Sequence, residues 1–145
     1  MNFNNEAALL CGVYHGADIG CDSIRTLLPK VKNPEFRSDL KTQYQQYQEI
    51  QNQAEEQLKT LGQCPEAASL PAKMGIMASI HLNTLANRET SHLANMMIQG
   101  STMGITEMTK ALNHYGPGDP KVRSLAENLV NTEQGNIERM KKYLS

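Results

Sequence analysis

The sequence contains only three cysteines, and this odd number without paired spacing excludes a disulfide framework. We therefore expect a protein of the reducing cytoplasm. No apolar run approaches the roughly 18 residues that a membrane span needs. Residues 1–6 contain no basic residue, so we expect no signal peptide. These shortages argue against a secreted, disulfide-rich scaffold and against a membrane-spanning protein.

The chain also lacks an excess of either charge, because 14 lysines and arginines oppose 15 aspartates and glutamates. No basic face is implied, which argues against nucleic acid or an anionic membrane surface as the main partner. No glycine-rich phosphate loop, nucleophile elbow or metalloprotease motif occurs. No catalytic residue is predicted, and the sequence leaves open whether the protein is an enzyme.

Three breaks are predicted from proline and glycine, at residues 32–34, 62–71 and 116–120. The long stretches between them contain few β-branched runs and are typical of helices. One continuous helix over residues 70–115 would be about 65 Å long, against about 40 Å for each of the first two helices. We therefore expect this stretch to be split near Ala86–Arg88.

The predicted helices form one domain over residues 1–145, which is the length of a single domain. They span residues 4–31, 34–61, 72–86, 88–115 and 119–144, give or take a few residues. Two pairs of long helices, each joined by a tight turn, are separated by a long crossover. This order predicts an all-α, ferritin-like up-down four-helix bundle with a short fifth helix in the crossover.

Four segments carry a family resemblance over nearly the whole chain. They are GADIGCDSI (16–24), LLPKV (27–31), SHLANMMIQGSTMGI (91–105) and EQGNIERMKKYL (133–144). Together they resemble small bacterial ferritin-like proteins of unknown function. The second predicted helix also resembles, more weakly, the spore coat protein F family, itself regarded as ferritin-like. The resemblance implies a bacterial origin and the fold, and it implies almost nothing about function.

A ferritin-like di-iron site needs one glutamate from each of two helices and a Glu-x-x-His pair from each of the other two. Glu133 holds the right place on the last helix, but Asn136 stands where histidine is required. Gln43 and Tyr47 occupy the inward positions of the second helix. A complete di-iron site is therefore not predicted. The four residues, all at seam positions, are instead predicted to form a buried polar cluster at mid-bundle.

Two hypotheses about function remain open. The first is a structural or interaction protein that has no cofactor. The second is a metal-binding or redox protein that holds iron or another divalent metal with Glu107 and Glu133 and non-standard partners. Glu107 belongs to the predicted inward seam of its helix, which comprises Leu93, Met97, Gly100, Gly104, Glu107, Ala111 and Tyr115.

Glycines recur at helical spacing on the first helix, at Gly12, Gly16 and Gly20. Each glycine inside a helix costs about 1 kcal/mol relative to alanine, and close approach of two helix backbones would offset that cost. The glycine face is predicted to meet either the third long helix or a second subunit. We expect a homo-oligomer to which the first helix contributes, with no other protein partner identified.

Overall fold

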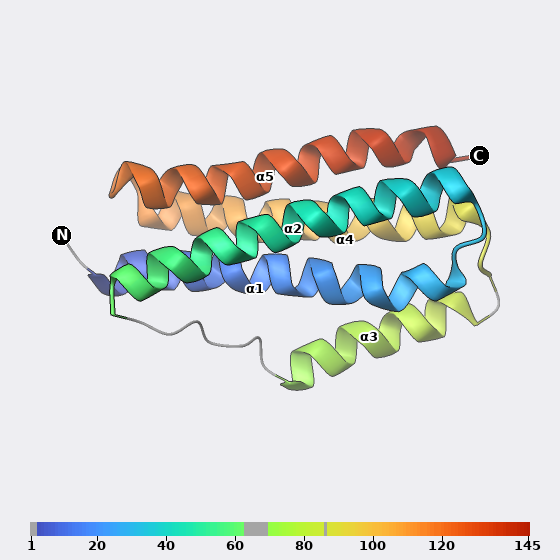
Figure 1. The fold of residues 1–145 in the computed structure, drawn as a ribbon, viewed down its shortest axis with the longest axis horizontal. Coiled ribbons are helices and arrows are strands. Elements are labelled where there is room, and N and C mark those ends of the chain that lie inside the picture. The colour runs from blue at the N-terminus through green and yellow to red at the C-terminus, as the bar shows by residue number, and fades with distance from the viewer. Residues whose placement is uncertain (1–2, 63–69, 86) are drawn as a thin grey trace.

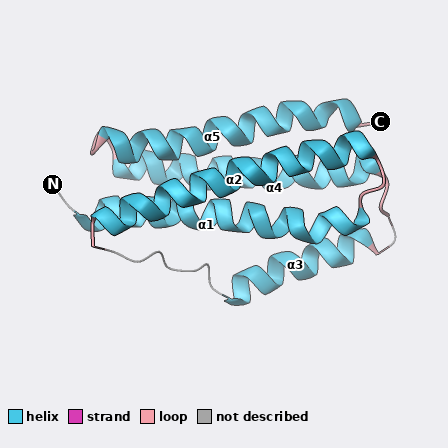
Figure 2. Ribbon diagram, viewed as in Figure 1, coloured by secondary structure: helices cyan, strands magenta, loops and turns pink. Residues whose placement is uncertain are grey.

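The computed structural model describes residues 3–62, 70–85 and 87–145. Its helices are α1 (Phe3–Leu27), α2 (Pro34–Thr60), α3 (Leu70–Thr84), α4 (Thr90–Tyr115) and α5 (Pro120–Met140), with short 3-10 helices η1 (Leu28–Lys30) and η2 (Lys141–Tyr143). The described residues contain no strand, as Figure 2 shows. The predicted all-α fold class is confirmed.

Four long helices lie side by side, and α3 lies outside them against α1 (Figure 1). Helices α1 and α2 form one antiparallel pair, and α4 and α5 form the other. Helix α3 lies in the crossover between the pairs, so that α2 and α5 also run antiparallel to each other. The order of the helices, two antiparallel pairs with a crossover helix between them, is the order that the sequence predicted.

Two of the expected helices end four residues earlier in the structure, at 27 instead of 31 and at 140 instead of 144. Helix α1 ends at Leu27, and η1 follows it instead of further α-helix up to residue 31. Pro29 explains the difference, because proline lacks an N–H group and its ring clashes with the preceding helical turn. Helix α5 likewise ends at Met140 and tightens into η2. The expected break near Ala86–Arg88 falls between α3 and α4, although residue 86 lies outside the described residues.

Helices α2 and α5 begin in the same way, with a side-chain cap followed by proline. The Asn33 side chain accepts a hydrogen bond from the backbone N–H of Phe36 at 3.0 Å. Asp119 accepts hydrogen bonds from the backbone N–H groups of Lys121 and Val122 at 2.8 and 3.4 Å. These caps satisfy donors that the first helical turn leaves free. They fix where the two helices start.

The core follows the axis of the bundle. Its fully buried members include Leu10, Val13, Ile24, Phe36, Leu40, Leu58, Leu93 and Met140. On α4 the buried line passes through Ser101 and Met108, one residue after the predicted Gly100 and Glu107. One residue corresponds to a rotation of about 100° on a helix, which places Glu107 on the outer surface. The predicted seam of α4 is therefore wrong at Gly100 and Glu107.

Helix α3 is held on the outside of α1 by polar contacts. The Thr26 hydroxyl donates to the Met77 sulfur at 2.8 Å, and Lys30 Nζ lies 3.2 Å from His81 Nδ1. Ile80 is buried against the bundle, but Leu82 and Leu85 are 71% and 74% exposed. One side of the crossover helix therefore leaves large apolar side chains uncovered.

Candidate functional site

A hydrogen-bonded group of three side chains occupies the middle of the bundle. The Tyr47 hydroxyl on α2 donates to Glu133 Oε1 on α5, and Ser101 Oγ on α4 lies 3.5 Å from the same carboxyl oxygen. All three residues are buried. Because each of the three residues lies inside a long helix, away from its ends, the three side chains are positioned by helical backbone and not by loops. This group is called the central triad below.

Two glycines make room for the central triad. A Cβ atom at Gly20 on α1 would lie 2.8 to 3.0 Å from carbons of the Tyr47 ring, and a Cβ at Gly104 on α4 would collide with Glu133 Oε2. In both cases the added carbon would lie closer to its neighbour than van der Waals contact allows. These glycines therefore accommodate side chains of other helices, whereas for Gly20 the sequence predicted a close approach of helix backbones.

Burial favours the uncharged form of the Glu133 carboxyl group at neutral pH. Burial raises the pKa of its carboxyl group from 4.5 to about 8. Among the described residues no lysine, arginine or histidine forms an ion pair with it. A neutral carboxyl group that accepts hydrogen bonds from two hydroxyl groups avoids the large cost of burying an isolated charge.

Two buried amides form a second polar layer next to the central triad. Gln43 and Asn136 are 0% and 1% exposed, which confirms that all four predicted cluster residues are buried. No side-chain nitrogen or oxygen of Gln43 or Asn136 has a hydrogen-bond partner among the described residues. Gln43 lies one turn before Tyr47 and Asn136 about one turn after Glu133. Because α2 and α5 are antiparallel, the two amides are at a similar level of the bundle.

Glu107, the other predicted metal ligand, lies on the surface and not among the buried polar residues. Its side chain is 72% exposed, and Lys110 Nζ lies 3.5 Å from its carboxylate. The structure therefore does not bring Glu107 and Glu133 together, and the predicted inward placement of Glu107 is wrong. No group of three or more histidine, cysteine, aspartate or glutamate residues in the described part of the chain has a geometry that could hold a metal ion.

Sequence reasoning missed Ser101 as a member of the site. The signal was present, because Ser101 follows the buried Met97 by four residues and precedes the buried Met108 by seven, which are helical spacings. A serine at this spacing predicts a buried polar position only when the side of α4 that faces the core is known. That side is set by how α4 packs against α5, which the sequence does not specify.

The chain is similar in fold to a solved protein. The crystal structure titled as a DUF305 fragment from Deinococcus radiodurans superimposes with a TM-score of 0.76, covering 95% of this chain and 93% of that chain at 21% sequence identity. At this identity the similarity shows the fold alone. No protein-family model and no curated protein matches the sequence. The resemblance to ferritin-like and spore coat protein F families therefore stays a prediction.

The glycine contacts predict opposite effects for two alanine substitutions. Gly20→Ala forces the Tyr47 ring to move, and overpacking of this kind costs about 1–3 kcal/mol of unfolding free energy. Gly100→Ala adds a methyl group with no heavy atom within 4 Å and should stabilise the protein by up to about 1 kcal/mol. Urea denaturation of both variants measures the difference. Equal stabilisation by both substitutions would show that Tyr47 is not packed against α1.

Glu133 should also make stability depend on pH. Its pKa is raised in the folded state, so the folded protein binds the proton more tightly than the unfolded chain. The stabilisation is complete below about pH 4.5, decreases as pH rises, and is lost above about pH 8. Each pH unit within this window changes the unfolding free energy by up to about 1.4 kcal/mol.

Glu133→Gln isolates this effect, because glutamine keeps the shape and an acceptor oxygen but does not titrate. We expect the stability difference between Glu133→Gln and the wild-type protein to change steadily from pH 5 to pH 8 in urea titrations. Both proteins contain the same four histidines, so the contribution of these histidines to the pH dependence of stability cancels in the difference. A difference that stays constant over this range would contradict a raised pKa for Glu133.

Proposed function

We propose that this protein is a structural or interaction protein whose helical bundle has a neutral polar centre in place of a complete di-iron site. One observation carries the proposal: the middle of the bundle holds a single buried carboxyl group, that of Glu133, which accepts hydrogen bonds from Tyr47 and Ser101. Iron sites of this fold class need several carboxylates and histidines to neutralise and orient two metal ions. Here amides and hydroxyl groups surround a single carboxyl group.

The cysteines are consistent with a role that requires no redox chemistry. Cys21 is buried, and burial raises the pKa of its thiol to about 11, so the thiol stays protonated and weakly reactive. Cys11 is also unbridged, while Cys64 lies outside the described residues. None of the described helices has the length and apolar character of a membrane span. A cytoplasmic location remains part of the proposal.

A second candidate function is metal binding, which the unpaired amides favour. The carbonyl oxygens of Gln43 and Asn136, together with the Glu133 carboxylate, would make an all-oxygen ligand set. Such sets suit hard divalent cations such as magnesium, calcium and manganese rather than a di-iron centre. Glu107 plays no part in this version of the site, because it is exposed on the outer face of α4.

Metal analysis separates the two candidates. For protein purified without added metal, we expect elemental analysis to find no stoichiometric iron, manganese, zinc, magnesium or calcium. We also expect the melting temperature to stay unchanged when each ion is added, because a neutral Glu133 gives a cation little attraction. A stoichiometric metal that is lost in Glu133→Gln would overturn the structural role and support the second candidate.

We also propose that copies of the chain associate, through the exposed side of α3 and not through the glycine face of α1 that the sequence predicted. A Cβ atom at Gly16 would lie 3.2 Å from Leu129 Cδ2 on α5, so this part of the glycine face points into the bundle. Gly16 faces α5, whereas the sequence predicted that it faces either α4 or a second subunit. Leu82 and Leu85 are the most exposed large apolar side chains in the described residues. Exposed apolar pairs of this kind favour contact with another protein surface.

Sedimentation equilibrium tests this association. We expect the wild-type protein to be a dimer or larger at micromolar concentration and the double variant Leu82→Ser, Leu85→Ser to be a monomer. Met103→Gln is the control, because Met103 is comparably exposed but lies on α4. A monomeric wild-type protein, or a double variant that still associates, would contradict association through α3.

A further inference from the structure

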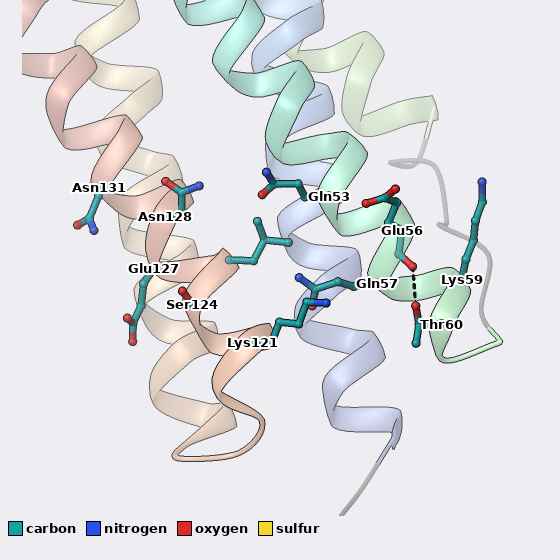
Figure 3. Close-up of a pocket in the computed structure, with 11 residues that line it drawn as sticks. Gln53, Glu56, Gln57, Lys59, Thr60, Lys121, Ser124, Glu127, Asn128 and Asn131 are labelled. Atoms are coloured by element: carbon teal, nitrogen blue, oxygen red, sulfur yellow. Dashed lines mark hydrogen bonds between the residues drawn. The ribbon is translucent and has the colours of Figure 1, made fainter.

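A polar groove lies between the C-terminal part of α2 and the N-terminal part of α5 (Figure 3). Its volume is about 920 Å³. The walls carry amide and hydroxyl side chains, which are Gln53, Gln57 and Thr60 on α2 and Ser124, Asn128 and Asn131 on α5. Leu125 on α5 is the apolar residue of the lining, and it is buried. The groove is therefore lined by groups that both donate and accept hydrogen bonds.

The spacing of these groups matches an extended peptide. Gln53 and Gln57 are four residues apart on a helix, which is about 6 Å along its axis, and Ser124 and Asn128 have the same separation. The main chain of an extended peptide repeats every two residues, which is about 6.6 Å. Side-chain amides pair with both the N–H and the C=O groups of such a chain. Two walls of this kind can hold a main chain from both edges.

Of the four charged side chains that line the groove, two form ion pairs with residues outside the lining. Lys59 pairs with Glu55 at 3.4 Å, and Glu127 pairs with Arg123 at 2.8 Å. Lys121 has no ion-pair partner among the described residues, and its side chain extends across the groove toward Gln57 (Figure 3).

Lys121 and Leu125 lie four residues apart on α5, which again matches a two-residue step of an extended chain. Alternate side chains of that chain point in the same direction, so an acidic residue would meet Lys121 while the residue two positions away covers Leu125, which lines the groove but is only 4% exposed. Glu56, on the α2 side of the lining, has no ion-pair partner among the described residues and disfavours a second acid.

We propose that this groove binds an extended peptide segment of a partner protein that carries an acidic residue two positions from an apolar one. The α5 side of the lining, from Lys121 to Asn131, is about 15 Å long, which holds four to five extended residues. The inference rests on the proposed role as an interaction protein and adds the chemistry of its partner. Metal analysis and peptide binding are separate measurements, so failure of one is distinguishable from failure of the other.

Two capped pentapeptides, SESLS and SKSLS, test the proposal in NMR titrations of the isotopically labelled full chain. We expect SESLS to shift backbone signals of residues 53–60 and 121–131 only, and SKSLS to bind at least about fivefold more weakly. Lys121→Gln should weaken SESLS binding by a similar factor. Lys41→Gln is the matched control, because it removes the same charge from an exposed site on α2 outside the groove.

Four results would overturn the proposal. They are the absence of shifts with SESLS at millimolar concentration, equal binding of the two peptides, unchanged binding in Lys121→Gln, and equivalent shifts caused by inorganic phosphate alone. The last result would mean that Lys121 is a simple anion site. Asn128→Ala provides a second variant that tests main-chain recognition at an exposed position, and it should weaken both peptides equally.

Discussion

Tyr47 and Glu133 meet in the middle of the bundle, and several neighbouring positions are explained by their contact. The tyrosine ring is larger, and the glutamate side chain reaches further, than the aliphatic side chains of a simple helical core. Gly20 and Gly104 provide that room on α1 and α4, and Ser101 supplies a second hydroxyl group near the acid. The glycines are costly inside helices, and this contact offsets that cost by filling the space they leave.

Polar side chains also distinguish the α2–α5 interface from the other faces of the bundle. The pairs α1–α2 and α4–α5 are joined by short connections, while α2 and α5 belong to different pairs (Figure 1). Along this interface the buried amides Gln43 and Asn136 are followed by the triad and then by the groove that contains Gln53 and Asn128. Helices α2 and α5 therefore meet partly through polar side chains, while α1 also joins the two pairs by packing against α4 and α5.

Much of this arrangement could be predicted because helices have a regular period. Prolines and glycines marked the breaks between helices, and seam positions on α2 and α5 correctly indicated that Gln43, Tyr47, Glu133 and Asn136 are buried. The same method failed on α4. Glycines and methionines there allow more than one seam, and the chosen seam placed Glu107 inside and left out Ser101.

The sequence by itself determined the all-α fold and the order of the helices in the described residues, because these depend on local periodicity and on the placement of proline and glycine. Only the tertiary structure decided which polar groups meet. The Tyr47–Glu133 contact joins residues 86 positions apart, and the raised pKa of Glu133 comes from burial by several helices together. The direction of the glycine faces and the groove between α2 and α5 likewise depend on helix rotation and separation, which no local pattern specifies.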